Sequence, residues 1–380
     1  MLPAIPFNKP YFSGLETKYI EEAVRSGKIS GDGIFTKRCH SYFEKQLGFN
    51  KVLLTTSCTD ALEMAALLLD LQPGDEVIVP SYTFVSTANA FVLRGATIVF
   101  ADSTAFSPNF DAASLASLVT PRTRAIVPVH YAGIACDMGT VQAVAGQYGL
   151  VVVEDAAQAI DSYYQGQPLG TLGALGAFSF HETKNIISGE GGLLAINDPR
   201  FEPRAEIIRE KGTNRSAFFR GEIDKYNWVD IGSSFLPSDI IAAYLWAQLE
   251  NLADIQARRK AIWQRYADAL APLREQDIGL PQIPAYATNN GHAFYLVARS
   301  LPERTALIEA LRRQHILAVF HYQPLHRSPY FARQHDGRAL PWAEHYADCL
   351  VRLPLYYELS ETDQNRVIEA MLAFYKTFYK

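Results

Sequence analysis

Short apolar runs alternate with helical patterns over the first half of the chain, and this alternation constrains the fold most strongly. The runs are rich in Val and Ile and do not alternate with polar residues, which is typical of strands buried on both faces of a largely parallel sheet. Between them lie helical patterns, so the order predicts a doubly wound α/β domain with a mostly parallel seven-stranded sheet. The expected strands are Val52–Thr55, Val77–Val79, Thr97–Phe100, Ala125–Val129, Val151–Glu154, Ala177–Phe180 and Leu193–Ile196, and the expected helices are Leu62–Leu71, Met138–Tyr148 and Pro203–Lys211.

The pattern changes after Ser233, where longer helices begin. A stretch rich in Pro, Gly and Asn at Ala271–Gly291 reads as a linker, and Ser360 is a plausible N-cap for the last helix. We therefore predict a large domain over residues 1–245 and a small α+β domain over residues 246–380. The elements expected after Ser233 are helices at Ser238–Leu252, Arg258–Leu270, Glu303–Gln314 and Glu361–Lys376, and strands at Ala293–Ala298 and Ile316–Phe320.

Composition excludes several classes of function. The chain of 380 residues has a net charge of −5, which argues against nucleic acid as a partner because phosphate backbones need a basic face. The sequence lacks a run of about 18 apolar residues, so we expect no membrane span, and its first residues do not show the pattern of a secretory signal. The dinucleotide, P-loop and zinc-protease motifs are absent, and the four cysteines are far apart. These features predict a cytoplasmic protein with reduced thiols and no metal site.

Lys184 lies in the segment GAFSFHETKNIISGEGG, a few residues after an apolar strand that ends at Phe180. A lysine just past a buried strand can lose part of its hydration, which lowers its pKa toward the range useful for a nucleophile. The alternative interpretation is a solvated surface lysine near a glycine turn, which is the commoner situation for lysine.

Asp155 lies in the segment VVVEDAAQ, at the end of the strand that runs through Glu154. Open α/β sheets bind ligands at this edge. A carboxylate there could hold the protonated ring nitrogen of pyridoxal phosphate, which needs such a partner to act as an electron sink. The alternative is an aspartate that caps the N-terminus of a helix.

Two further segments place polar and aromatic residues after strands. In LTTSCTDAL, Ser57, Cys58 and Thr59 occupy a strand-to-helix turn, where free N–H groups favour a phosphate. In PSYTFVSTAN, Phe84 could stack on a ring. The simpler interpretations are a plain helix cap for LTTSCTDAL and a core phenylalanine for Phe84. Together with Lys184 and Asp155, these residues match the needs of pyridoxal phosphate.

The segments GDEVIVPSYTFVSTANA, VEDAAQ and FSFHETKN with GEGG resemble the sugar aminotransferases of the DegT/DnrJ/EryC/StrS family. The resemblance runs from Phe7 to the C-terminal helix. It implies the aspartate aminotransferase-like fold (fold type I) and a homodimeric transaminase that acts on nucleotide-linked keto sugars. By motif position it also implies that Lys184 is the Schiff-base lysine, that Asp155 pairs with the pyridine nitrogen and that Gln158 contacts the phenolic oxygen. It further implies that Phe84 stacks on the ring and that Cys58, Thr59 and Ser179 hold the phosphate.

One departure from the family concerns the partner subunit. The usual pattern is G-x-N-x-R-M, whereas this chain reads GSSFLP from Gly232 to Pro237. Ser234 stands where the asparagine would reach into the neighbouring site, and Leu236 replaces the arginine. The serine hydroxyl could still serve the cross-subunit phosphate contact.

The segments REKGTNRSAFFRGEIDKYNWVDIGSSFLPSD and VFHYQPLH are similar to the branch of this family that makes dTDP-4-amino-4,6-dideoxy-D-galactose, a sugar of the enterobacterial common antigen. This similarity implies a dTDP-4-keto-6-deoxy-D-glucose substrate and L-glutamate as donor. The alternatives are another keto position or sugar nucleotide, a sugar 3-dehydratase (whose relatives carry His at the lysine position), and a non-catalytic binding protein.

Several residues are candidates for contact with the substrate. His181 precedes the lysine closely, and His321, Tyr322 and His326 lie in a loop that the family places over the sugar nucleotide. A structural role is an equally good interpretation of His181, and lone histidines in a loop such as His321 and His326 are more often plain loop residues. Arg215 and Arg220 could meet a diphosphate, although a solvated loop is at least as good an interpretation of them.

The segment Gly212–Leu236 predicts the assembly. It is long, polar and aromatic, and no strand or helix pattern organises it. A loop of this length in a compact domain is usually functional, and its aromatic residues could be buried reciprocally across a two-fold interface. We therefore expect an obligate homodimer whose active sites lie at the interface.

Overall fold

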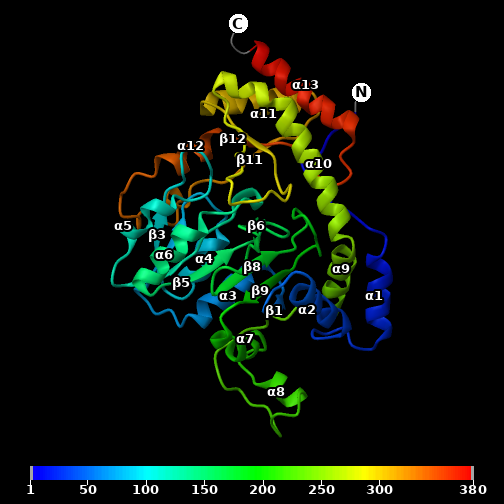
Figure 1. Cartoon of the computed structure of the whole chain (residues 1–380). Helices are drawn as coiled ribbons and strands as arrows, with labels where there is room; N and C mark the ends of the chain where they lie inside the picture. Colours follow the sequence, from blue (N-terminus) through cyan, green and yellow to red (C-terminus); the bar gives the residue numbers. More distant parts are fainter. Residues whose placement is uncertain (1–2, 378–380) are drawn as a thin grey trace.

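The computed structural model describes residues 3–377 and contains a large sheet, a small sheet and a short hairpin (Figure 1). The large sheet has seven strands in the order β1, β9, β8, β5, β4, β2, β3. Only β9 runs antiparallel to its neighbours β1 and β8, so the prediction of a mostly parallel sheet is confirmed. Its strands are β1 Lys51–Thr55, β2 Glu76–Pro80, β3 Thr97–Ala101, β4 Thr123–Ile126, β5 Val151–Asp155, β8 Leu175–Ser179 and β9 Gly192–Ile196.

The small sheet is antiparallel, with β12 between β10 and β11. Ile5 forms a parallel bridge with Ile316, so the N-terminal segment packs beside this sheet. The remaining strands are β10 Tyr295–Val297, β11 Val319–Phe320, β12 Leu350–Arg352 and the hairpin pair β6 Tyr163–Tyr164 and β7 Gln167–Pro168. The predicted boundary near residue 245 falls inside a helix, and the division into domains stays a prediction.

Helices cover the large sheet, and α9 and α10 run from its flank to the small sheet (Figure 1). None of the helices in the described part of the chain is long and apolar enough to cross a membrane. The helices are α1 Glu16–Arg25, α2 Ile34–Gln46, α3 Cys58–Leu68, α4 Ser86–Val92, α5 Leu115–Leu118, α6 Met138–Tyr148, α7 Glu202–Arg209, α8 Arg215–Phe219, α9 Asp239–Glu250, α10 Leu252–Leu270, α11 Leu301–Arg313, α12 Pro341–Cys349 and α13 Glu361–Thr377. Short 3₁₀ turns lie at Ala112–Ser114, Tyr131–Gly133, Pro199–Phe201, Ala271–Gln276 and Leu325–Arg327.

The large sheet is buried on both faces, as its unalternating strands predict. Along β2, Val77 and Val79 contribute to one apolar core, whereas Ile78 contributes to the core on the opposite face. A third core lies around the small sheet and includes Leu296 and Val351. Each face of the large sheet is therefore covered by its own layer of helices, and a site can form only at the ends of the strands.

Local chemistry accounts for several element boundaries. Ser57 caps α3 by accepting a hydrogen bond from the Asp60 amide at 3.0 Å. Gly149 takes the left-handed conformation that ends α6. Ser360 accepts from the Asp363 amide at 3.0 Å, as its prediction as a cap requires.

Sequence patterns missed other elements. Helices α1, α2, α4 and α12 and strand β12 were not predicted, because short or weakly periodic segments depend on tertiary packing to become regular. The expected strand Ala125–Val129 ends at Ile126, although Val129 still bridges Asp155. Helix α10 begins at Leu252, which is earlier than expected.

The segment Gly212–Leu236 projects from the body at the end far from the small sheet (Figure 1). It is not wholly irregular, because it contains the short helix α8 and a bridge between Thr213 and Trp228. Four of its aromatic side chains are exposed on the single chain, namely Phe218, Phe219, Tyr226 and Trp228, whereas Phe235 is buried; Trp228 is 81% exposed.

Candidate active site

The carboxyl ends of the parallel strands share one edge of the large sheet, and a cavity of about 620 Å³ lies there. The strand register brings the ends of β1 and β8 together at this edge. Thr55 at the end of β1 and Ser179 at the end of β8 both pair with Gly192, the first residue of β9. The cavity is lined by most of the residues that the sequence predicts, namely Cys58, Thr59, Phe84, Asp155, Gln158, Ser179, His181, Lys184, His321 and Tyr322.

Asp155 ends β5 with its carboxylate in the cavity and is almost completely buried. Its Oδ2 accepts a hydrogen bond from the Thr87 hydroxyl at 2.7 Å, and its Oδ1 accepts from the Ala157 amide at 3.1 Å. No helix begins here in the described chain, so the interpretation of Asp155 as a helix cap is wrong. The carboxylate is held in one orientation and has no cationic partner in an ion pair within residues 3–377. It can therefore receive a cationic ligand group.

Lys184 follows β8 in a turn in which its amide donates to the His181 carbonyl at 2.9 Å. The side chain is partly buried and lines the cavity. Burial lowers the pKa of Lys184 below its ordinary value, while the neighbouring Cys58 and Asp155 raise it in part. The structure therefore does not support the interpretation as a solvated surface lysine. The amine has the environment of a nucleophile or proton carrier.

The N-terminus of α3 forms one wall of the cavity at Cys58 and Thr59. Amides in the first turn of a helix lack intrahelical partners and attract anions. Gly192 lies so close that a Cβ there would be 2.3 Å from the Ser57 carbonyl oxygen and 2.5 Å from the Cys58 nitrogen. Burial raises the pKa of the Cys58 thiol, so the thiol is not a reactive nucleophile. This end of the cavity fits a phosphate group.

Gln158 and Tyr322 both line the cavity and contact one another. The Gln158 Nε2 donates to the Tyr322 hydroxyl at 3.2 Å, and its Oε1 accepts from the Ala132 amide at 2.7 Å. Tyr322 has a left-handed backbone with φ of 53°, which turns its ring toward Phe84, 6.3 Å between centroids. Phe84 is 56% exposed and is therefore not a core residue. Its ring is free to stack on a planar ligand.

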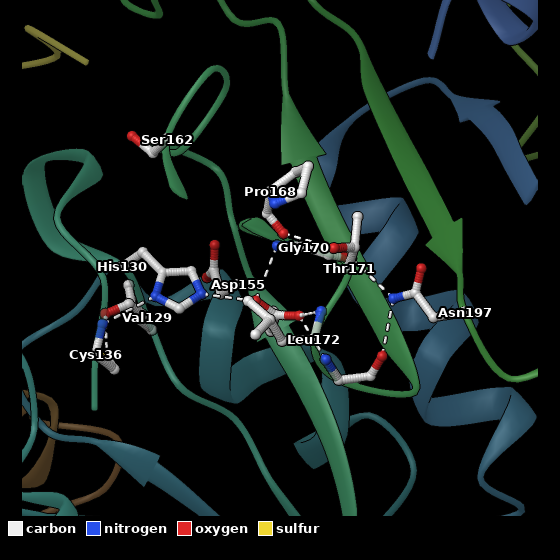
Figure 2. Close-up of polar contacts among 12 residues, drawn as sticks. Val129, His130, Cys136, Asp155, Ser162, Pro168, Gly170, Thr171, Leu172 and Asn197 are labelled. Carbon is white, nitrogen blue, oxygen red and sulfur yellow. Dashed lines mark hydrogen bonds and ion pairs between the residues drawn. The ribbon is translucent and has the colours of Figure 1, made fainter. Parts of the chain in front are cut away.

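Glu154 precedes Asp155 in β5, so its side chain lies on the opposite face of that strand. Figure 2 shows its neighbours His130, Gly170 and Leu172. The fully buried carboxylate of Glu154 accepts hydrogen bonds from the amides of Gly170, Leu172 and Gly173 and lies 2.9 Å from His130 Nε2. Because His130 Nδ1 accepts from the Cys136 amide at 3.2 Å, the ring proton is on Nε2 and is donated to Glu154. The network ties β5 to the loop before β8.

Some predicted residues lie elsewhere. His326 is buried away from the cavity, with Nδ1 2.7 Å from the Ser81 hydroxyl and Nε2 3.1 Å from Glu344. These contacts favour a structural role for His326 over contact with the substrate. Ser234 is exposed and does not line the cavity of its own chain. Arg215 stacks on Phe219, and Arg220 pairs with Glu206 and Glu222 on the projecting segment.

The sequence analysis missed other residues that line the cavity. His292 is held through Nδ1 by Asn185 at 2.8 Å, and burial lowers its pKa well below the ordinary value. Arg352 comes from β12 of the small sheet. Neither belongs to a recognisable local motif, although an arginine inside the apolar run VRLPL is an unusual residue for a buried strand. The remaining lining residues include Ser57, Thr83, Ser86, Thr183, Glu190 and Phe320.

Comparisons with known proteins give the class. A sequence profile of the DegT/DnrJ/EryC1/StrS aminotransferase family matches residues 11–372. The spore coat polysaccharide biosynthesis protein SpsC of Bacillus subtilis is 34% identical over 97% of this chain and 96% of its own. The chain therefore belongs to the DegT/DnrJ/EryC1/StrS aminotransferase family.

Solved structures confirm the predicted fold. The aminotransferase TlmJ of Streptoalloteichus hindustanus has a TM-score of 0.91 and 30% identity, covering 99% of this chain and 100% of its own. The putative sugar aminotransferase Spr1654 of Streptococcus pneumoniae, in a PMP form, has a TM-score of 0.90 and 27% identity, covering 100% of both chains. A PLP form of Spr1654 is also similar, with a TM-score of 0.89 and 27% identity over 98% of both chains. The predictions of an aspartate aminotransferase-like fold and of a pyridoxal phosphate-dependent aminotransferase are confirmed.

Proposed function

We propose that this protein transfers the amino group of L-glutamate to C4 of dTDP-4-keto-6-deoxy-D-glucose, which yields dTDP-4-amino-4,6-dideoxy-D-galactose and 2-oxoglutarate. The observation that carries the proposal is the single cavity that Lys184, Asp155, Gln158, Phe84 and the N-terminus of α3 share. The sugar is proposed from the similarity of the segments around Gly212–Leu236 and Val319–His326 to one branch of the family. The product class fits a polysaccharide such as the enterobacterial common antigen or an O-antigen.

Lys184 is the proposed catalytic residue. Pyridoxal phosphate, when bound, supplies an electron sink and carries the amino group between the two substrates. Lys184 would hold the cofactor through Nζ. Once released, the Lys184 amine takes the proton from Cα of glutamate as general base and delivers a proton to C4 of the sugar as general acid. Its lowered pKa suits this exchange, because an amine that titrates nearer neutrality can both accept and donate.

The surrounding residues fit the cofactor. Asp155 would keep the ring nitrogen protonated, and Gln158 would contact the phenolic oxygen. Phe84 would stack on the cofactor ring. The phosphate would bind at the N-terminus of α3, where Cys58 and Thr59 lie, and Ser179 would add a hydroxyl from the end of β8.

The sugar-nucleotide end of the cavity is proposed to include His181, His321 and Tyr322, which line it. His181 is partly buried, and its Nδ1 contacts the hydroxyl of Thr183 at 3.0 Å and the Thr183 amide at 3.3 Å. Its Nε2 lies 3.7 Å from the carboxylate of Glu190, so Nε2 is the atom that would meet a ligand. The relative SpsC carries polysaccharide biosynthesis in its name, and Spr1654 is named a sugar aminotransferase. Both names support a sugar as the amino acceptor.

We also propose a homodimer. The exposed aromatic side chains of Gly212–Leu236 support it, because burial against a second copy would remove them from water. Ser234, exposed on its own chain, would then reach the phosphate site of the partner. A cytoplasmic location is proposed from the spacing of the four cysteines, which predicts reduced thiols.

The decisive experiment incubates the purified protein with dTDP-4-keto-6-deoxyglucose and L-glutamate. Mass spectrometry and NMR should identify the 4-amino sugar and the configuration at C4, and an equal amount of 2-oxoglutarate should form. A deoxygenated sugar without an amino group would indicate the 3-dehydratase alternative. No 2-oxoglutarate from any keto sugar would favour the non-catalytic alternative.

A variant tests the role of the lysine. Lys184→Ala should remove the visible absorption band of the holoenzyme and reduce turnover by at least about 1,000-fold, because both the covalent link and the proton carrier are lost. Lys211→Ala is the matched control, since Lys211 lies outside the cavity near the projecting segment. Full turnover of Lys184→Ala would contradict the proposal.

A further inference from the structure

His292 places a buried imidazole in the wall of the cavity that Lys184 also lines. It lies just before β10 and is only 4% exposed. Burial lowers the pKa of His292 well below its ordinary value, and Lys184 contributes most among the charges that add to this effect. The ring is therefore neutral, and one of its two nitrogens is a donor while the other is an acceptor. Its hydrogen bonds decide which nitrogen is the acceptor.

A chain of side-chain hydrogen bonds fixes the proton of His292 on Nδ1. Nε2 of Gln256 lies 3.2 Å from a carboxylate oxygen of Asp161, which can only accept, so Gln256 presents Oε1 to Asn185. Nδ2 of Asn185 then donates to that oxygen and to the Asn290 carbonyl, both at 2.9 Å. The remaining atom, Oδ1 of Asn185, accepts from Nδ1 of His292 at 2.8 Å. Nε2 of His292 therefore carries no proton and offers a lone pair.

The backbone of His292 is held equally firmly. Its amide donates to Oδ1 of Asn290 at 2.9 Å, and its carbonyl accepts from the Arg259 guanidinium at 2.9 Å. Within residues 3–377, Nε2 has no hydrogen-bond partner, although the residue lines the cavity. A lone pair is thus fixed in place without a donor, and leaving a buried polar atom unpaired costs free energy. This arrangement indicates a donor that reaches Nε2 from the cavity.

The other histidines that line the cavity do not offer such an acceptor. Nδ1 of His181 accepts from the Thr183 amide at 3.3 Å, so its Nε2 carries the proton and is a donor. His321 has both nitrogens engaged, with Nε2 3.2 Å from the Arg352 guanidinium and Nδ1 2.9 Å from a tyrosine hydroxyl. Of the three histidines that line the cavity in the described chain, His292 alone presents a free acceptor.

Lys184 has the complementary need. Within the described residues its amine forms no hydrogen bond and no ion pair, and it lines the same cavity. The carboxylate of Asp155 already accepts from Thr87 and Ala157 and is proposed to pair with the cofactor ring. A free amine that takes and returns a proton must be held in one orientation. An acceptor for one N–H would hold it so and would leave the nitrogen lone pair for the substrate.

We propose that Nε2 of His292 accepts a hydrogen bond from Nζ of the free Lys184 and so positions the amine for proton transfer, an assignment that rests on the proposed transamination. The neutral amine donates one N–H to His292, and its lone pair takes the proton from Cα of the amino donor. The resulting ammonium keeps the same hydrogen bond and delivers a proton to C4 of the sugar. His292 does not take the proton itself, because burial disfavours its charged form. It is a positioning residue that acts through Lys184.

Two substitutions at His292 separate the roles of its two nitrogens. The amide group of asparagine lies where Nδ1 is, and the amide group of glutamine lies where Nε2 is. His292→Asn therefore keeps a donor for Asn185 but removes the acceptor that meets the cavity. His292→Gln keeps that acceptor and loses the donor for Asn185. Loss of the lysine contact and loss of the buried network thus fall on different variants.

The first measurement follows the half-reaction of the holoenzyme with L-glutamate. Each protein is mixed rapidly with a series of glutamate concentrations while the visible band of the cofactor is followed. We expect the limiting rate constant of His292→Asn to fall about 10-fold or more, because a misoriented proton carrier reacts more slowly. The half-saturating glutamate concentration should change less than about 3-fold, since no binding contact is removed. His292→Gln should keep a limiting rate constant within about 3-fold of wild type.

The second measurement examines Lys184 without turnover. The protein is loaded with pyridoxamine phosphate, which leaves Lys184 free, and acetylation of Lys184 by acetic anhydride is followed against pH by mass spectrometry. A hydrogen bond to the charged amine favours that form, so its loss in His292→Asn should lower the midpoint of labelling by about 0.5 pH unit or more. His292→Gln should keep the wild-type midpoint. His315→Asn is the matched control, since His315 is exposed, lies outside the cavity and has a left-handed φ of 58° that asparagine tolerates.

Other results would overturn the assignment. An unchanged limiting rate constant in His292→Asn would do so, as would an unchanged labelling midpoint. Equal losses in both variants would assign His292 to the buried network alone, and a change confined to the half-saturating concentration would make it a substrate contact. If the wild-type holoenzyme does not respond to glutamate, the proposed donor is wrong, and the labelling midpoints still decide whether His292 contacts Lys184.

Discussion

The hydroxyl of Thr87 donates a hydrogen bond of 2.7 Å to Oδ2 of Asp155. Thr87 lies in the first turns of α4, a helix that sequence patterns do not predict, and it accepts in turn from Thr83 at 2.9 Å. The orientation of the carboxylate therefore depends on two elements, β5 and α4. Helix α4, which begins inside the segment PSYTFVSTAN, thus orients the carboxylate that we propose pairs with the cofactor.

Thr87→Val tests this relationship, because valine keeps the shape and removes the donor. We expect kcat to fall about 10-fold or more, since a hydrogen bond to a charged acceptor is worth roughly 1.5–3 kcal/mol. Steady-state kinetics measure the effect, and Thr87→Ser, which keeps the hydroxyl, should recover most of the rate. A Thr87→Val enzyme with unchanged kcat would show that the carboxylate is oriented without α4.

The lowered pKa of Lys184 predicts the pH dependence of cofactor capture. Only the neutral amine attacks the aldehyde of pyridoxal phosphate, so the rate of reconstitution should rise with pH as Lys184 loses its proton. Burial disfavours the charged amine, so the midpoint should lie below the ordinary lysine pKa of about 10.4. Stopped-flow absorbance of the cofactor-free protein measures it. A midpoint at or above the ordinary value would contradict the burial argument.

Glu154 is predicted to matter for stability. Glu154→Gln replaces one acceptor oxygen by an NH₂ group, which would face the donors of Gly170, Leu172, Gly173 or His130 (Figure 2). We expect the free energy of unfolding to fall by about 3 kcal/mol, as for other broken buried pairs. Denaturant unfolding measures the change. Glu275→Gln, at an exposed position, should stay within about 0.5 kcal/mol of wild type, and equal stabilities for the two variants would refute the role.

The proposed dimer predicts a linkage between assembly and cofactor. Trp228→Ala should weaken dimerisation roughly 10-fold or more, because exposed tryptophans that become buried at an interface are often dominant contacts. Over a dilution series, the fraction of dimer measured by sedimentation velocity and the cofactor absorbance should fall together. Phe106→Ala is the control, because Phe106 is 74% exposed but lies outside Gly212–Leu236. A monomer that retains its cofactor and full activity would rule out the shared site.

The residues at the ends of the large-sheet strands could be located from sequence. Cys58, Asp155 and Lys184 each follow a buried apolar run, and parallel strands present their carboxyl ends at one edge. Local sequence alone was sufficient because the chain runs directly from strand to site. The family motifs then distinguished a ligand site from ordinary helix caps and loop residues.

The small-sheet side could not be located in this way. His326 follows β11 closely and was expected at the substrate, yet its ring is buried between Ser81 and Glu344. Arg352 carries no motif and faces the cavity. These positions depend on how β12 pairs between β10 and β11, and on the docking of that sheet over the large one.

By itself, the sequence determined the fold class, the family and the residues that meet at the edge of the large sheet, because buried strands and their following turns are local features. Only the tertiary structure decided which distant side chains complete the cavity. Arg352 and His292 line the same cavity as Lys184, although each lies more than 100 residues from it in the chain. Packing between distant elements brings them together, and local sequence patterns do not report the energy of such packing.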